Sequence, residues 1–372
     1  MQRNLIALIT HEYPPTRGGA GVYCEELAHA SMQSDINVEV LAPSNALTEN
    51  SIKVRKMSHK GSQSWICSWK LIRHVKKNLS QYKYLHLADP GVLRAMIRFG
   101  WLLKEKPPFL VTIHGSELLC FTKNVWEKFL FQKLLSEAKK IHVLSLHNEK
   151  NLKTLCPKLE KRILRIPGAP ARRVIPEKEN LNGKENSANF SRIALLCVGR
   201  VHPRKGQLEL IQAIGNLNSR SQKKLVCRMV GPTVHHSYYK KLKRAAALLD
   251  CPVEFLGDQE DEELKISYAN ADIFALTSIP HPKSIEGFGF VYLEASAHGL
   301  PIVAHRTGGV EDAVKDKVTG FLTDPNNPSE LTDKIDSLIN DYELRKIMGK
   351  KGKEWADRHS WTNIAQKLYA NL

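Results

Sequence analysis

The chain has 372 residues, of which 42% are hydrophobic and 25% charged, so its length favours two domains and its composition excludes an intrinsically disordered protein. No stretch reaches the roughly 18 uncharged apolar residues that a membrane-spanning helix needs. The formal net charge of +17 indicates an anionic partner, and it lies mainly in residues 1–168, where 26 Lys and Arg face 13 Asp and Glu.

Short apolar runs alternate with longer amphipathic stretches, a pattern typical of parallel sheets with helices on both faces. In the first half, strands are predicted at residues 5–10, 38–42, 84–88, 109–114, 141–145 and 163–166. In the second half, they are predicted at 193–198, 225–230, 253–256, 273–277 and 301–304. We expect an α/β fold of two doubly wound, Rossmann-like domains facing a central cleft, where the carboxyl ends of the strands bind ligand.

The domain boundaries follow from the same pattern. Residues 169–190 are rich in Pro, Lys, Glu and Asn without an apolar period and predict a linker between domains at 1–168 and 191–355. Residues 356–372 predict a closing helix, for which a return to the first domain is left open. The seven cysteines are scattered singly, which is typical of free thiols in the cytoplasm rather than of a zinc site or disulfides.

Three glycine-containing loops follow predicted strands. Gly18, Gly19 and Gly21 lead into a helix whose positive end favours phosphate, although a plain flexible turn explains them equally well. Gly199-Arg200 and Lys205-Gly206 follow residues 193–198, so the two cations can converge on one anion, the alternative being a solvated basic turn.

The third loop carries two carboxylates. Glu286 precedes Gly287-Phe288-Gly289-Phe290, and Glu294 lies in the helix that follows. An ionised carboxylate accepts two hydrogen bonds from adjacent hydroxyls, so Glu286 is predicted to meet a sugar and Glu294 a ribose diol. Either glutamate could instead be a solvent-facing helix residue.

In combination these loops, together with Thr112-Ile113-His114-Gly115 and Gly308-Gly309, resemble the retaining glycosyltransferases of the GT-B fold, family 4 (glycosyl transferases group 1), over nearly the whole chain. The resemblance implies an acceptor domain at 1–168 and a nucleotide-sugar domain at 191–355. It implies His114, Arg200, Lys205 and Glu286 as catalytic residues. It also implies the donor-binding set Gly18, Gly19, Arg200, Lys205, Glu286, Gly287, Phe288, Gly289, Phe290 and Glu294.

The activity implied by the resemblance is transfer of a hexosyl group, with retention of configuration, from a GDP-mannose, UDP-glucose or UDP-GlcNAc type of donor. No cofactor or metal is expected, and the sequence has no Asp-x-Asp motif for a metal-bridged diphosphate. Two alternatives stay open, a nucleotide-sugar epimerase with the GT-B fold and a basic nucleic-acid-binding protein. No RNA-recognition or zinc-finger pattern supports the second of these.

The acceptor is expected to be lipid-linked or an envelope glycan. Apolar residues recur at helical spacing over 65–79, with Lys and Arg at many of the positions between them. This pattern is most often a helix packed on a core, but a basic amphipathic element resting on anionic lipid has the same pattern. We therefore expect a cytoplasmic protein involved in cell-envelope polysaccharide biosynthesis, with a peripheral position on the inner face of the membrane as an alternative.

Overall fold

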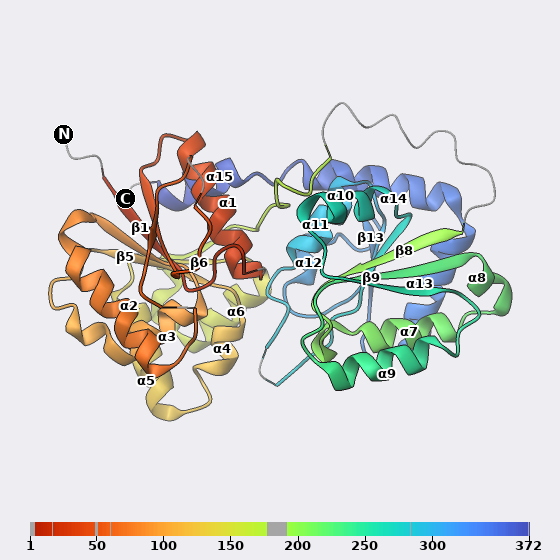
Figure 1. Ribbon diagram of the computed structural model, residues 1–372, viewed down its shortest axis with the longest axis horizontal. Helices are drawn as coiled ribbons and strands as arrows, with labels where there is room; N and C mark the ends of the chain where they lie inside the picture. The colour runs from red at the N-terminus through yellow and green to blue at the C-terminus, as the bar shows by residue number, and fades with distance from the viewer. Residues whose placement is uncertain are drawn as a thin grey trace. The chain divides into compact units, whose positions relative to one another are not determined.

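The computed structural model describes residues 4–16, 18–48, 51–59, 61–176, 192–282, 284–370 and 372. The chain divides into two units (Figure 1). The first unit comprises Met1–Gly168, Pro282–Phe288 and Ser360–Leu372, and the second comprises Ala169–His281 and Gly289–His359. Most of the predicted linker, residues 177–190, lies outside the described residues.

The first unit is built on a seven-stranded parallel sheet in the order β3-β2-β1-β4-β5-β6-β7. Its strands are β1 (Ile6–Ile9), β2 (Val38–Ala42), β3 (Val54–Lys56), β4 (Tyr84–Leu87), β5 (Phe109–Ile113), β6 (Lys140–Val143) and β7 (Ile163–Arg165). From β1 the sheet continues through β2 to β3 at one edge, and from β4 it continues through β5 and β6 to β7 at the other edge. The switch point, where ligands bind in open α/β sheets, therefore lies between the carboxyl ends of β1 and β4.

Helices cover this sheet in two layers (Figure 1). α2 (Trp65–Asn78) packs on α3 (Pro90–Phe99), which packs on α5 (Val125–Glu137). α1 (Gly19–Gln33) packs on α15 (Trp361–Tyr369), so the last helix of the chain belongs to the first unit. The remaining helices of this unit are α4 (Ser116–Cys120) and α6 (Leu146–Leu155).

The two faces of this sheet bury different kinds of side chain. Residues of each strand alternate between the faces, because successive side chains of a strand point in opposite directions. One set joins an apolar core with α2, α3 and α5, and includes Ala7, Ile9, Leu85, Leu87, Val111 and Ile113. The other face carries a buried polar network. Tyr23 Oη lies 3.0 Å from His142 Nδ1, and His86 bonds Thr112 and Tyr369 at 2.7 and 2.9 Å. Tyr369 thereby ties α15 to the sheet.

The second unit contains a six-stranded parallel sheet in the order β10-β9-β8-β11-β12-β13. Its strands are β8 (Ile193–Val198), β9 (Leu225–Val230), β10 (Val253–Gly257), β11 (Ile273–Leu276), β12 (Ile302–His305) and β13 (Gly320–Thr323). Its helices are α7 (Gln207–Gly215), α8 (Ser219–Lys223), α9 (His236–Ala246), α10 (Asp261–Ala269), α11 (Phe290–Ala297), α12 (Val310–Ala313), α13 (Pro328–Asn340) and α14 (Tyr342–Ala356). Here the switch point lies between β8 and β11.

The predicted α/β fold is confirmed, and each of the eleven predicted strands is present with bounds that shift by at most two residues. Two strands were not predicted, β3 and β13, and both lie at an edge of their sheet. β3 has only three residues, two of them basic, and β13 begins with a glycine, so neither shows an apolar run of strand length. Among the described residues, no helix combines the length and the apolar character needed to cross a membrane.

Candidate functional site

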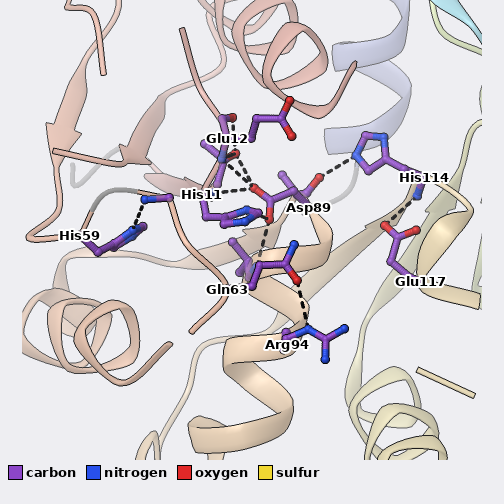
Figure 2. Close-up of polar contacts among 12 residues, drawn as sticks. His11, Glu12, His59, Gln63, Asp89, Arg94, His114 and Glu117 are labelled. Atoms are coloured by element: carbon purple, nitrogen blue, oxygen red, sulfur yellow. Dashed lines mark hydrogen bonds and ion pairs between the residues drawn. The ribbon is translucent and has the colours of Figure 1, made fainter. Parts of the chain in front are cut away.

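At the switch point of the first unit, the loops after β1 and β4 are joined by a histidine–aspartate pair (Figure 2). Asp89 lies two residues after the end of β4 and is completely buried. Its Oδ1 lies 2.8 Å from Nδ1 of His11 and accepts the backbone N–H of Val92 at 2.9 Å, which caps α3. Its Oδ2 accepts the Thr10 hydroxyl at 2.6 Å. One buried carboxylate therefore fixes two loops and a helix start.

The two partners favour each other's ionised forms. Burial disfavours the ionised carboxyl of Asp89, but the His11 ring and the hydrogen bonds outweigh burial and hold its pKa well below the usual range. Burial lowers the pKa of His11, yet the neighbouring Asp89 outweighs that effect and raises it overall. The ring needs a glycine beside it, because a Cβ on Gly91 would lie 2.2 Å from His11 Cε1.

His114 follows β5, the next strand of the sheet, and is half-buried. Its Nε2 lies 2.8 Å from the carbonyl oxygen of Ala88, the residue before Asp89, so this ring is tied to the same switch point. The buried carboxylate of Glu117 accepts the backbone N–H groups of His114 and Gly115 at 3.0 and 2.8 Å (Figure 2). The turn is thus rigid on both sides of the imidazole.

The segment that carries Glu286 packs against this turn within the first unit. A Cβ on Gly287 would lie 1.6 Å from the carbonyl oxygen of His114, so only glycine permits the approach. Asn148 Nδ2 donates to the carbonyl oxygen of Gly287 at 3.5 Å, and Asn148 is itself buried. The structure therefore brings Glu286, which is half-buried, next to His114 in the fold.

At the start of α1, where the sequence predicts a phosphate, Gly18 lies beside a carboxylate of the protein itself. Gly18 is the N-cap of α1 in extended conformation. A Cβ on Gly18 would lie 1.5 Å from Oε1 of Glu12, so the carboxylate of Glu12 fills that space. The protein's own carboxylate lies beside the helix start, where negative charge is favourable.

In the second unit, both predicted cations lie in the loop after β8. Arg200 is exposed, and its carbonyl oxygen accepts Nε2 of Gln207 at 2.9 Å. Lys205 is half-buried, and its aliphatic chain runs past Gly199, whose missing Cβ would lie 3.6 Å from Lys205 Cδ. Lys205 ends a 3-10 turn, η5 (Pro203–Lys205), and α7 begins two residues later.

The two loops of this second switch point are locked together by Gly206. This residue has a φ of +70° and separates η5 from α7. The Thr277 hydroxyl, just after β11, donates to the carbonyl oxygen of Gly206 at 2.6 Å. A Cβ on Gly206 would lie 1.7 Å from the Thr277 carbonyl oxygen, so no other residue fits.

Glu294 lies inside α11 and is only 6% exposed. Its Oε2 accepts the Tyr268 hydroxyl at 2.9 Å. Burial raises the pKa of the carboxyl to about 7, against the opposing effect of hydrogen bonds from Tyr268 and the backbone of Ala171. Gly289, at a φ of +87°, turns the chain into α11, and the side chains of Phe288 and Phe290 are both buried.

The predicted site residues thus fall into two groups, each at the carboxyl ends of its own sheet. The residues in the first unit are Gly18, Gly19, His114, Glu286, Gly287 and Phe288, and those in the second are Arg200, Lys205, Gly289, Phe290 and Glu294. Their roles stay predictions. Among the described residues no three His, Cys, Asp or Glu side chains group as a metal site requires.

Sequence reasoning missed four residues that build the first switch point, namely His11, Asp89, Glu117 and Asn148. His11 and Asp89 each directly follow a predicted strand, at residues 5–10 and 84–88, which is a usable signal. What the sequence lacked was the pairing of β1 with β4, which places the two residues together. Glu117 and Asn148 lie inside short helical segments, where no sequence pattern marks them.

Comparison with known proteins identifies the family. The model for glycosyltransferase family 4 matches residues 17–169, and that for glycosyl transferases group 1 matches residues 178–355. An uncharacterized glycosyltransferase of Methanocaldococcus jannaschii is 27% identical, covering 97% of this chain and 96% of the relative. A GDP-mannose-dependent alpha-(1-6)-phosphatidylinositol monomannoside mannosyltransferase of Mycolicibacterium smegmatis is 32% identical, covering 54% of this chain and 53% of the relative.

Solved structures agree on the fold. Anabaena HepE in complex with UDP and glucose superposes with a TM-score of 0.76 at 19% identity, covering 98% of both chains. Sucrose-phosphate synthase from Thermosynechococcus elongatus superposes with a TM-score of 0.80 at 21% identity, covering 98% of this chain and 97% of the other. The chain therefore belongs to the family 4 glycosyltransferases, also called glycosyl transferases group 1, and it is a glycosyltransferase of the GT-B type.

Proposed function

We propose that this glycosyltransferase moves a hexosyl group from a nucleoside-diphosphate sugar to a lipid-linked or envelope-glycan acceptor, with retention of configuration and without a metal ion. The observation that carries the proposal is the pair of cations, Arg200 and Lys205, in the loop at the second switch point. That loop is held rigid by Gly206, so the cations are positioned before the ligand arrives.

The donor is assigned by the chemistry of these side chains. Arg200 is exposed and Lys205 is partly so, and the two charges suit the diphosphate. Glu294 is buried within α11, and its carboxylate can accept hydrogen bonds from the two hydroxyls of a ribose. UDP and glucose are bound by HepE, according to the description of that structure, which supports the same class of donor here.

In the proposed reaction, an acceptor hydroxyl oxygen forms a bond to the anomeric carbon on the face from which the diphosphate departs. The bond between the anomeric carbon and the phosphate oxygen breaks, and the hydroxyl proton passes to the leaving phosphate. The protein then needs no side-chain nucleophile. Arg200 and Lys205 stabilise the charge that develops on the diphosphate, while Glu286 and His114 hold the transferred sugar.

The acceptor is assigned to the first unit by charge. Most of the net charge lies in residues 1–168, which suits an acceptor with anionic groups. Two matched relatives act, by their names, on a phosphatidylinositol monomannoside and on D-inositol 3-phosphate, both of which carry phosphate. A phosphate-bearing lipid or glycan precursor is therefore the proposed acceptor class.

The first experiment identifies the donor. A panel of UDP-, GDP- and ADP-sugars is screened for thermal stabilisation, since a ligand that binds only the folded state raises apparent stability by mass action. Release of nucleoside diphosphate is then measured with and without acceptor. Release that requires an acceptor supports transfer. Interconversion of the nucleotide-sugar without any acceptor identifies an epimerase and refutes the proposal.

The second experiment tests the site. Lys205→Ala and Glu286→Ala should abolish turnover while leaving the thermal unfolding of the free protein nearly unchanged, because neither side chain is fully buried. Lys240→Ala and Glu262→Ala, on the exposed faces of α9 and α10, are the matched controls and should retain activity. Near-normal activity in either site variant would show that the roles are misassigned.

A further inference from the structure

The first unit exposes large aromatic side chains at one place. Every exposed tryptophan or phenylalanine among the described residues comes from α2, α5 or η2 (Gly100–Leu102). These residues are Trp65, Trp69, Trp101, Trp126 and Phe129. The six most exposed apolar side chains of these three elements are between 58% and 80% exposed. We call these six the aromatic surface; they are Trp65, Ile66, Trp101, Val125, Trp126 and Phe129. Isolated exposed apolar residues are ordinary, but such a concentration marks an interaction site.

The apolar residues that recur at helical spacing over residues 65–79 are buried in the second half of α2 and exposed in its first turns. Ile72 and Val75 are buried in the core of the first unit, as a core-packed helix requires. Trp65, two turns before Ile72 on the same stripe, is 63% exposed, and the neighbouring Ile66 is 67% exposed. The second half of α2 therefore packs on the fold, and its first turns extend the apolar stripe out to solvent.

Contacts through α3 connect the separate parts of the aromatic surface. The ring of Trp65 packs at 5.7 Å from that of Phe99, and the guanidinium of Arg98 lies 4.4 Å from the Trp65 ring centre. Trp101 Nε1 donates to the carbonyl oxygen of Arg98 at 3.2 Å. The layer of α2, α3 and α5 lies together in Figure 1, with α3 packed against both other helices.

Cations accompany the aromatic surface. Between residues 61 and 137 there are twelve Lys and Arg against five Asp and Glu, and two of the five acids, Asp89 and Glu117, are buried. Of the other three, Glu127 pairs with Arg94 at 2.8 Å and Glu137 with Lys106. Exposed cations on the same helices include Lys70 and Arg73 of α2 and Lys128 of α5, and Lys123 lies in the turn just before α5. Long basic side chains can bury their stems beside apolar groups and keep the charge in water.

We propose that the aromatic surface docks onto an anionic lipid bilayer. Tryptophan prefers the headgroup region, where its ring is buried and its N–H stays wet, and lysine and arginine pair there with anionic headgroups. A second copy of the chain would place like charges against each other. Aliphatic Ile66 and Val125 offer no stacking face to the bases of a nucleic acid. The inference extends the proposed function by giving the enzyme a route to lipid-linked acceptors.

The test measures binding of the whole protein to vesicles without donor or acceptor. Vesicles are made of phosphatidylcholine alone, or of phosphatidylcholine and phosphatidylglycerol in roughly equal amounts, and bound protein is measured by flotation. The wild type should float with the anionic vesicles and not with the neutral ones. The variant Trp126→Ser with Phe129→Ser should lose binding by at least about tenfold, because two inserted side chains are removed.

The matched control is Leu248→Ser with Ile266→Ser, two exposed apolar residues of the second unit, and it should bind vesicles as the wild type does. A second readout is quenching of tryptophan fluorescence by lipids brominated in the acyl chain, which should be weakened in Trp126→Ser. Equal binding of the wild type and the Trp126→Ser, Phe129→Ser variant overturns the proposal. So does equal binding to neutral and anionic vesicles.

Two rival partners give distinct outcomes. If the wild type self-associates in sedimentation and the double variant is monomeric, with no vesicle binding by either, the surface is an interface between copies. If the wild type binds single-stranded DNA through these residues and not vesicles, it is a nucleic-acid surface. Either outcome overturns lipid docking. Donor-induced thermal stabilisation is measured separately, so failure of the docking proposal is distinguishable from failure of the proposed transferase reaction.

Discussion

Replacement of Glu294 by Gln should stabilise the second unit increasingly as the pH rises. The carboxyl is buried against Tyr268, and its folded-state pKa is about 7, whereas the model value is 4.5. Between these values the folded state binds more protons than the unfolded state, so stability falls as the pH rises from the unfolded to the folded pKa. The difference of about 2.5 pH units corresponds to about 3 kcal/mol, fully lost above pH 7.

The glutamine variant keeps the shape and a carbonyl oxygen for the Tyr268 hydroxyl but has no titratable proton. Its advantage over the wild type should therefore be small near pH 4.5 and grow to about 3 kcal/mol above pH 7. For a unit of this size the increase corresponds to a difference in midpoint temperature of about 6 to 12 °C in scanning calorimetry. Other groups titrate equally in both proteins and cancel in the difference.

Glu262→Gln, the same substitution at an exposed position of α10, is measured alongside as the control for replacing a glutamate by glutamine in this unit. The same Glu294 variant also examines the ribose assignment. Hydroxyls that donate to the carboxylate favour its ionised form, so binding of nucleoside diphosphate should release a proton near pH 6 in the wild type and fewer in Glu294→Gln. A pH-independent stability difference between Glu294→Gln and the wild type would falsify the burial argument.

Three further outcomes follow from the site. Gly206→Ala should lose donor binding and about 2 kcal/mol or more of stability, measured by thermal shift, because its Cβ would meet the Thr277 carbonyl and its φ is positive. Asp89→Asn should destabilise the first unit most between about pH 4 and 6.5. Below that window protonation of Asp89, whose pKa is lowered, removes the ionic contribution, and above it deprotonation of His11 does so, which chemical denaturation at several pH values can verify. Activity should survive EDTA, and restoration by added Mg²⁺ after inhibition would contradict the metal-free reaction.

Local patterns were sufficient to predict the strands, because each buried parallel strand is a nearly continuous apolar run. They could not predict the order of the strands. β1 pairs with both β2 and β4, although β4 begins 75 residues after β1 ends, and this pairing is set by long-range packing. The contact between His11 and Asp89 is a consequence of that order. It could not be predicted until the order was known.

The contacts of the glycines also could not be predicted from local sequence patterns. In the sequence, Gly18, Gly206 and Gly287 marked glycine-containing loops after predicted strands. In the structure, each glycine leaves room for another part of the protein, namely the Glu12 carboxylate, the Thr277 carbonyl and the His114 carbonyl. The type of residue was predictable, but its immediate neighbour depends on loops that lie far away in the sequence.

These close approaches bear on catalysis as well as on folding. A loop with open space around its glycines would have to be ordered by the ligand, and that ordering would be subtracted from the binding energy. Gly206 and Gly287 instead lie against backbone carbonyls with no space for a methyl group, so the loops beside Lys205 and Glu286 are already fixed in the free protein. If the proposed reaction depends on stabilising a departing diphosphate, such preorganised groups lower the barrier without reorganising during the reaction. The energy for that arrangement comes from folding, through contacts such as the Thr277–Gly206 hydrogen bond, before any donor is bound.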